Sequence, residues 1–213
     1  MDDIQYPELY DAIIAGNAKV SAAVTQKAID AGADPQVLLN NSMIEAMNEV
    51  GRRFEANECF VPELLISARA MKAALEIIRP LLKGEGAEPA GRVVIGTVQG
   101  DLHDIGKNLV ATMLEGGGFE IFDIGVDASP DKFVDAVQKN TPDLVALSAL
   151  LTTTLPAMKR IVDKLTQAGV RENIKVIVGG APVTQGFADE IGADGYSDNA
   201  AGAVTLARRL LAS

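Results

Sequence analysis

The first 83 residues show only the apolar spacing of amphipathic helices, with apolar side chains three or four positions apart. Gly16 and Gly32 end two of these stretches and predict C-terminal caps, while Asp34 followed by Pro35 predicts a helix start. Short connections between helices predict a small four-helix bundle. The four helices are expected at residues 7–16, 17–32, 34–55 and 62–82.

From Arg92 onward, short apolar strands alternate with helical stretches. This alternation predicts an α/β domain with a doubly wound, five-stranded parallel sheet of the Rossmann or flavodoxin-like kind, in which ligands bind at the carboxyl ends of the strands. The glycine, glutamate and proline of the segment between the two halves predict a linker. We therefore expect a helical domain at 1–83, a linker at 84–91 and an α/β domain at 92–213.

The charge and composition restrict the classes of partner. A net charge of -10 argues against nucleic acid, whose binding requires clustered basic residues. No apolar run approaches the roughly 20 residues of a membrane span, and the acidic N-terminus fits neither a signal peptide nor a transit peptide. The single cysteine, Cys59, permits no internal disulfide. We expect a cytoplasmic protein that binds neither nucleic acid nor membrane.

The chain has one histidine, His103, directly after the first predicted strand. Asp101 can accept a hydrogen bond from one imidazole nitrogen, which leaves the lone pair of the other nitrogen free for a metal. Gly100 and Gly106 flank this loop and allow an unusual backbone path and close approach by a large ligand. The simpler interpretation is a loop histidine that makes a local hydrogen bond.

The surrounding sequence does not match the phosphate-binding motifs. It lacks the paired G-x-G of dinucleotide sites, and "GDLHDIGKN" is one residue too long between its glycines for a P-loop and ends in Asn108. A zinc site made only of protein needs about four ligands, and there is no second histidine. One protein nitrogen suffices when the metal brings its other ligands in a macrocycle, haem or corrin. The C-x-x-C-H motif of covalent haem attachment is missing.

The segment "DLHDIG" resembles the D-x-H-x-x-G motif of cobalamin-binding domains, in which the histidine displaces the cofactor's dimethylbenzimidazole base and binds cobalt from below. "LSALLTTTL" resembles the S-x-L segment that lines the channel for the displaced nucleotide tail, and "VGGAP" resembles the Gly-Gly turn beside the end of that tail. The resemblance implies a base-off cobalamin or related corrinoid with His103 as the metal ligand. It assigns these residues to the cofactor: Asp101, Leu102, His103, Asp104, Ile105, Gly106, Ser148, Leu150, Thr152, Gly179 and Gly180.

In this family a third residue hydrogen-bonds the aspartate, commonly a serine six positions after the serine of S-x-L. That position is Thr154 here, so the resemblance implies a relay of His103, Asp101 and Thr154. The threonine keeps the hydroxyl and adds a methyl group. The alternative is that Thr152 and Thr154 cap the N-terminus of the next helix.

The helical half is similar to the four-helix cap that precedes this domain in methionine synthase and in the small corrinoid proteins of methanogens and acetogens. "GRRFEANECFVPELL" resembles the cap stretch whose apolar side chains cover the methyl group on the upper face, which implies Phe54, Val61 and Leu64. Val61 stands where leucine is usual. The alternative is ordinary bundle core, and a further set of residues is expected in the core in either case: Met43, Met47 and Met71.

The resemblance implies a corrinoid methyl carrier that cycles between cobalt(I) and methyl-cobalt(III). It would be a subunit of a multi-component methyltransferase system rather than a catalyst alone. Its implied partners are a substrate-specific methyltransferase, a second methyltransferase that uses tetrahydrofolate or coenzyme M, and a reductive activator. The linker would serve as the hinge of the cap. The methyl donor stays open among methanol, methylamines, betaines and aryl methyl ethers.

Three other functions are compatible with parts of the sequence. A cobalamin-dependent sensor shares both domains but usually adds a DNA-binding or signalling module. The cobalamin subunit of a radical mutase shares D-x-H-x-x-G but lacks the four-helix cap. In a bare flavodoxin-like domain the histidine would be incidental, and cofactor content would distinguish that case.

Overall fold

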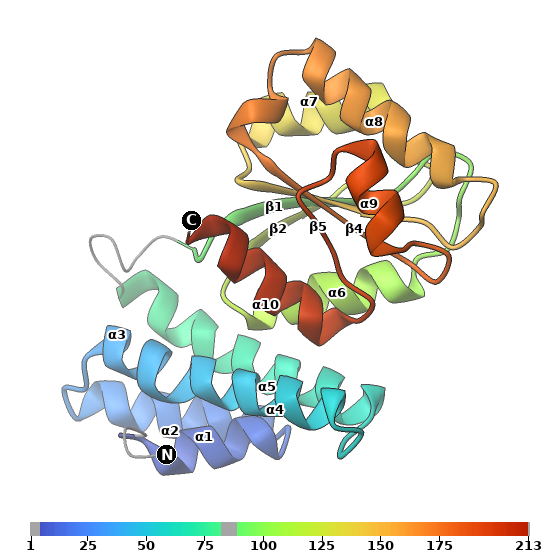
Figure 1. Cartoon of the computed structure of the whole chain (residues 1–213). Coiled ribbons are helices and arrows are strands. Elements are labelled where there is room, and N and C mark those ends of the chain that lie inside the picture. Colours follow the sequence, from blue (N-terminus) through green and yellow to red (C-terminus); the bar gives the residue numbers. More distant parts are fainter. Residues whose placement is uncertain (1–4, 82–88, 213) are drawn as a thin grey trace. The chain divides into compact units, whose positions relative to one another are not determined.

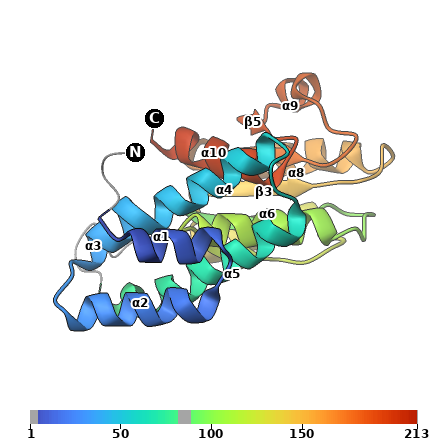
Figure 2. The ribbon, with the colours of Figure 1, turned by 90° about the horizontal axis from the view of Figure 1, so that it is seen from below.

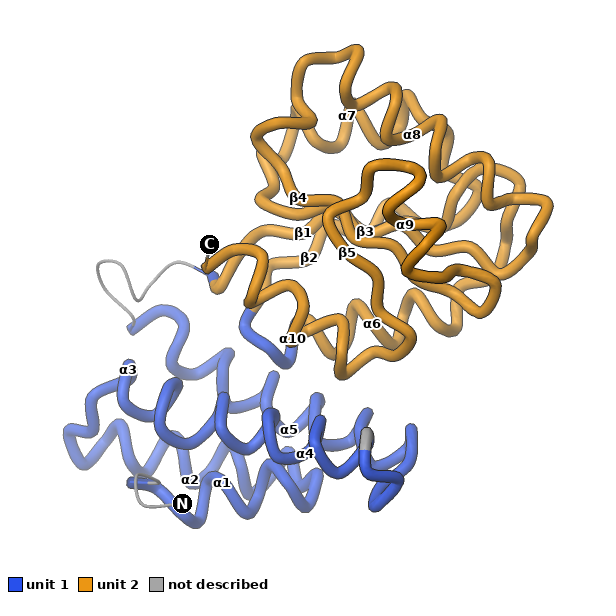
Figure 3. The backbone as a smooth tube through the Cα atoms, viewed as in Figure 1, with its two compact units in different colours: residues 1–89, 115–118 blue, residues 90–114, 119–213 orange. Residues whose placement is uncertain are grey.

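The computed structural model describes residues 5–81 and 89–212 and divides the chain into two compact units (Figure 3). Unit 1 comprises residues 1–89 together with 115–118, and unit 2 comprises 90–114 and 119–213. Most of the expected linker, residues 84–88, lies outside the described residues. The expectation of a hinge there therefore stays a prediction.

Unit 1 is helical, as the apolar spacing predicts, and its helices run side by side (Figures 1 and 2). Side chains cap two of the helix starts, because Asn17 accepts a hydrogen bond from the Val20 N–H and Asp34 accepts one from the Gln36 N–H. The three methionines expected in the core are buried. The helices are α1 (Pro7–Ile14), α2 (Ala18–Asp30), α3 (Pro35–Leu38), α4 (Glu45–Glu55) and α5 (Val61–Ile78).

Two boundaries differ from the expected ones. The helix expected over 34–55 is interrupted by a π-helical stretch, Leu39–Ile44, between α3 and α4. In this stretch Ser42 is buried and its hydroxyl oxygen accepts a hydrogen bond from the Tyr6 N–H at 3.3 Å. The α-helix expected over 62–82 ends early, at Ile78, because Pro80 cannot continue the backbone hydrogen bonds.

Unit 2 contains the predicted five-stranded parallel sheet, in the order β2-β1-β3-β4-β5 (Figure 1). The first strand in the chain lies inside the sheet, between β2 and β3, so the chain reverses its direction of winding there. Such a reversal is the topological switch point at which α/β sheets bind ligands. The strands are β1 (Arg92–Thr97), β2 (Glu120–Asp123), β3 (Leu144–Ser148), β4 (Lys175–Gly179) and β5 (Gly195–Tyr196).

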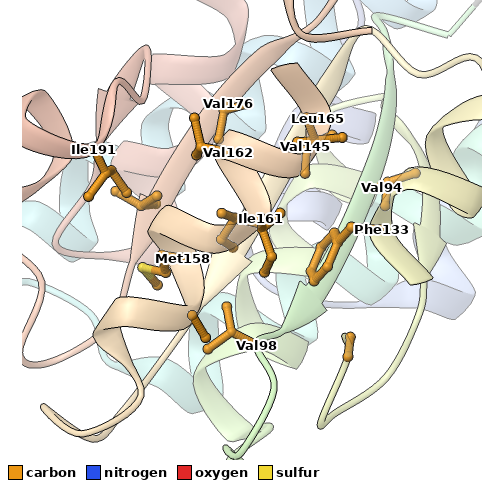
Figure 4. Packing of buried hydrophobic residues seen from close by; sticks show 14 of the residues in the cluster. Val94, Val98, Phe133, Val145, Met158, Ile161, Val162, Leu165, Val176 and Ile191 are labelled. Atoms are coloured by element: carbon orange, nitrogen blue, oxygen red, sulfur yellow. The ribbon is translucent and has the colours of Figure 1, made fainter. Parts of the chain in front are cut away.

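Helices cover both faces of the sheet, so successive strand residues are buried on opposite sides. Val94 packs with Phe133 of α7 and Ile161 of α8 on one face (Figure 4), while its neighbour Val93 packs with Leu114 and other residues on the other face. Burial on both faces explains the continuous apolar strand sequences. None of the helices described in either unit is long and apolar enough to span a membrane. The helices of this half are α6 (Ile105–Gly116), α7 (Pro130–Asn140), α8 (Leu155–Gln167), α9 (Gln185–Ile191) and α10 (Ala200–Leu211).

Candidate functional site

The three motifs found in the sequence meet at one edge of the sheet. Thr97, Ser148 and Gly179, the last residues of β1, β3 and β4, are aligned across the three neighbouring strands. The histidine loop, residues 98–104, follows β1, and the β3–α8 loop, residues 149–154, follows β3. The structure therefore brings the histidine, the serine and the glycine pair to the carboxyl edge where the fold places ligands.

A buried carboxylate joins the histidine loop to the β3–α8 loop. Asp101 is fully buried. Its Oδ1 accepts hydrogen bonds from the backbone N–H of His103 at 3.0 Å and from the ring Nδ1 at 2.7 Å. Its Oδ2 accepts from the N–H groups of Leu150 and Leu151 at 2.7 and 3.3 Å and from the Thr154 hydroxyl at 2.9 Å. These hydrogen bonds stabilise the negative charge of the Asp101 carboxylate, which would be unfavourable in a buried position without them.

These hydrogen bonds determine the protonation of Asp101 and the tautomer of His103. Burial alone raises the pKa of the Asp101 carboxyl, but the hydrogen bonds from Leu150, His103 and Thr154 outweigh it and hold that pKa well below its usual range. The carboxylate can only accept, so in the neutral imidazole Nδ1 carries the ring hydrogen and Nε2 carries the lone pair. Nε2 has no hydrogen-bond partner in the described part of the chain, and the side chain is 51% exposed.

The backbone of the histidine loop depends on a tight turn. The Asp101 N–H donates to the Val98 carbonyl oxygen at 3.1 Å, and Gly100 inside this turn has φ +86°, which glycine adopts readily. The Thr97 hydroxyl donates to the His103 carbonyl oxygen at 2.9 Å and closes the loop, a role that the sequence reading missed. The expected unusual backbone is confirmed at Gly100 and is wrong for Gly106, which has no positive φ.

Thr154 is the third member of the network, as the resemblance implied. It occupies the N-cap position of α8, but its side chain makes no capping hydrogen bond. The hydroxyl oxygen instead lies 2.9 Å from Asp101 Oδ2 and 2.8 Å from the Leu151 carbonyl oxygen. The alternative that the Thr154 side chain caps α8 is therefore wrong. Thr152 lies exposed in the turn before Thr154.

The glycine pair at the end of β4 lies close to the backbone of two other segments. A Cβ on Gly180, whose φ is +133°, would lie 1.8 Å from the Ala149 carbonyl oxygen, and a Cβ on Gly179 would lie 3.1 Å from the Ser197 carbonyl oxygen. The Ala149 N–H also donates to the Gly179 carbonyl oxygen at 3.3 Å. The β3–α8 loop thus packs directly on this turn, a reason for the glycines that does not involve a ligand.

Exposed apolar side chains occur in the chain next to His103 and in the β3–α8 loop. Leu102 and Ile105, on either side of His103, are 71% and 86% exposed, and Leu150 and Leu151 are also exposed. No group of three or more histidine, cysteine, aspartate or glutamate side chains in the described residues could hold a metal ion. The site therefore suits a metal that arrives within an apolar macrocycle, and His103 can supply one axial nitrogen.

The residues assigned to the cap differ in exposure. Leu64 is fully buried, as ordinary core packing predicts, while Phe54 is half-buried and Val61 is exposed. The sequence did not predict a role for Phe60, the N-cap residue of α5, whose side chain is 65% exposed. Phe60 and Val61 are therefore two neighbouring exposed apolar residues at the start of α5.

Comparison with known proteins defines the class of this chain. Residues 91–205 match the family model described as "B12 binding domain", and residues 6–79 match a second model with the same description. The chain belongs to the B12-binding family, and both of its halves are recognised parts of that family.

Named relatives cover nearly the whole chain. "Dimethylamine corrinoid protein 1" of Methanosarcina acetivorans is 43% identical over 206 residues, which cover 96% of each chain. A cobalamin-binding protein from Desulfitobacterium hafniense DCB-2 has a TM-score of 0.82 at 36% identity, covering 97% of this chain and 98% of that chain. The methanol:cobalamin methyltransferase complex MtaBC from Methanosarcina barkeri has a TM-score of 0.85 at 32% identity, covering 100% of this chain and 81% of that chain.

The first prediction concerns the buried carboxylate. We expect Asp101→Ala to lower the free energy of unfolding of the cofactor-free chain by roughly 3 kcal/mol or more, because it leaves several buried donors without an acceptor. Asp104→Ala is the matched control, since the Asp104 side chain is exposed and, among the residues that the structure describes, accepts a hydrogen bond from the nearby Asn108 side chain alone. Urea unfolding followed by circular dichroism measures both variants. Equal, small losses would contradict the structural role of Asp101.

The second prediction concerns the Gly-Gly turn. We expect Gly180→Ala to cost roughly 3 kcal/mol or more, because the new Cβ meets a backbone oxygen and the φ is unfavourable for alanine. Gly186→Ala is the control, because a Cβ there meets nothing within 4 Å and φ is not positive. Thermal unfolding of the two variants provides the comparison. A Gly180→Ala variant as stable as the control would show that the turn can move away from Ala149.

Proposed function

We propose that this chain is a corrinoid methyl carrier in which His103 is the lower ligand of the cobalt, in place of the cofactor's own base. The observation that carries the proposal is the exposed imidazole whose Nδ1 is fixed by the buried Asp101, so that the Nε2 lone pair faces outward. The names of the relatives support it, since they include a dimethylamine corrinoid protein and a methanol:cobalamin methyltransferase complex.

The other motif residues are proposed to hold the displaced nucleotide tail. Ser148 and Gly179 are neighbours in register at the end of the sheet, and both have small side chains. Thr152 lies exposed in the adjacent loop. Leu102 and Ile105 provide exposed apolar surface suited to the underside of a corrin ring. Together these residues offer small and polar side chains at the end of the sheet and exposed apolar side chains in the histidine loop and the first turn of α6.

The Asp101 and Thr154 side chains are proposed to orient the ligand and to accommodate a proton. The Thr154 hydroxyl has one hydrogen and two acceptors within reach, Asp101 Oδ2 and the Leu151 carbonyl oxygen. With a proton on Oδ2, the hydroxyl can accept from Asp101 and donate to Leu151, so both contacts of the Thr154 hydroxyl stay hydrogen-bonded. This arrangement supports a relay from His103 through Asp101 to Thr154.

Unit 1 is proposed to supply the cap for the upper face. Phe54, Val61 and Leu64 are the positions that the family pattern assigns, and Phe60 joins them because its aromatic side chain is exposed. Leu64 is fully buried, so we expect it to support the neighbouring side chains rather than to reach a ligand. The proposed hinge for this cap is the segment at 84–91.

The partners are proposed to be methyltransferases. When bound, the corrinoid supplies a cobalt centre that can accept a methyl group and release it to another acceptor. A substrate-specific methyltransferase would deliver the methyl group, a second one would pass it to tetrahydrofolate or coenzyme M, and a reductive activator would restore the reduced cofactor. We propose that donor choice lies with the first partner.

Methyl carriage predicts a donor-dependent change in a loaded chain. The full chain is loaded with cobalamin, reduced under anaerobic conditions, and mixed with a dialysed extract of its source organism. Methanol, each methylamine, betaine and an aryl methyl ether are then added one at a time. We expect one donor class to convert the absorbance from that of reduced to that of methylated corrinoid. The control is the same mixture without added donor.

The outcome separates binding from carriage. Conversion with one donor class, and none without donor, would support the proposed carrier. A chain that binds the corrinoid but is methylated by no donor in an extract that methylates free corrinoid would contradict methyl carriage and leave only cobalamin binding.

A further inference from the structure

A second loop holds the histidine loop by its backbone. Asp127 lies in the β2–α7 loop, residues 124–129. Its Oδ1 accepts a hydrogen bond from the Gly100 N–H at 2.7 Å, and its own N–H donates to the Asp101 carbonyl oxygen at 3.0 Å. Asp127 therefore binds the backbone on both sides of the peptide bond between Gly100 and Asp101.

The pairing of β1 with β2 continues beyond the strands and aligns the two loops. The Thr97 N–H donates to the Gly125 carbonyl oxygen at 2.9 Å, and the Ala128 N–H donates to the Thr97 carbonyl oxygen at 2.9 Å. Val98 forms an isolated parallel bridge with Ala128. This register places Asp127 opposite the tight turn of the histidine loop, where the Gly100 N–H points out of the turn.

The residue type at 127 fits this contact. Asp127 has φ +49°, a left-handed conformation that few residues other than glycine, asparagine and aspartate adopt. The residue is exposed, so core packing does not account for its conformation. The two hydrogen bonds to the histidine loop account for both the left-handed backbone and the acceptor on the side chain.

We infer that Asp127 is a positioning residue for the lower ligand, an inference that rests on the proposed function. Its carboxylate bonds the Gly100 backbone, not the imidazole. It fixes the main chain at Asp101 from the side of β2, while the β3–α8 loop holds the Asp101 carboxylate from the side of β3. Contacts from both neighbouring loops fix the position of Asp101, and its hydrogen bond to Nδ1 then fixes the orientation of the His103 ring. Without the Asp127 carboxylate the Gly100 N–H loses this acceptor, and the β2–α7 loop holds the histidine loop through backbone hydrogen bonds alone.

Four variants separate the hydrogen bond from other effects. Asp127→Gly keeps the left-handed backbone and removes the acceptor, while Asp127→Asn keeps both the backbone preference and an acceptor oxygen. Ser129→Ala is the matched control, because it removes a hydrogen bond of the same loop, from the Lys132 N–H to the Ser129 hydroxyl at 3.3 Å, away from the histidine loop. If Asp127→Gly does not fold, Asp127→Glu replaces it, because the longer side chain displaces the acceptor.

The chain offers a specific readout because His103 is its only histidine. The full chain, labelled with ¹⁵N-histidine, is loaded with unlabelled cobalamin. In the cobalt(II) state, electron paramagnetic resonance shows a nitrogen doublet if the labelled imidazole is bound and a triplet if the cofactor's own base is bound. A cyanide titration of the oxidised protein then measures how strongly the imidazole binds the cobalt, because cyanide would take the lower position when the imidazole dissociates.

We expect a doublet in wild type and half-conversion of Asp127→Gly at about a tenfold lower cyanide concentration, the factor that one lost hydrogen bond to a carboxylate represents. Asp127→Asn and Ser129→Ala should stay close to wild type. Equal titrations for Asp127→Gly and wild type would overturn the inference, and so would an equal shift in Ser129→Ala or in Asp127→Asn. A triplet or no binding in wild type would instead overturn the proposed ligation by His103.

Discussion

Five hydrogen bonds from two loops converge on the buried carboxylate of Asp101, and the site depends on that convergence. A buried charge is strongly unfavourable unless it is fully hydrogen-bonded, so both loops must adopt the conformation that supplies the donors. The Leu150 and Leu151 N–H groups turn inward, and Thr154 gives up side-chain capping of α8. The result is an imidazole whose Nδ1 is fixed by Asp101, in loops that also carry exposed apolar side chains.

This constraint is compatible with the proposed use of a single histidine as the protein's ligand to the cobalt. The described residues offer no cluster of ligands that could hold a bare ion, yet His103 presents one oriented lone pair among exposed leucine and isoleucine side chains. A metal that brings its own equatorial ligands needs only one oriented lone pair from the protein. The protein's contribution is then the direction of the ring, which is set by hydrogen bonds to Asp101 rather than by direct packing around the imidazole.

Much of the fold and part of the site could be predicted from the sequence. Alternating strands and helices predicted the parallel sheet, and the position of His103 after the first strand predicted its place at the carboxyl edge. Backbone donors such as the Leu150 N–H could not be predicted, because every residue except proline carries a backbone N–H. The contact of Asp127 with Gly100 could not be predicted either, because it depends on a register between strands that the sequence does not specify. The π-helical stretch was missed because it adds one residue to a turn within a segment whose apolar spacing otherwise predicts one continuous helix.

The most direct test of ligation by His103 is an anaerobic titration of the cofactor-free chain with cobalamin, followed by absorbance, in wild type and His103→Ala. The structure predicts tight binding in wild type with the spectrum of a histidine-ligated corrinoid, and loss of that spectrum in the variant. Identical spectra in the two proteins would contradict the account, because the imidazole held by Asp101 would then have no part in binding the metal.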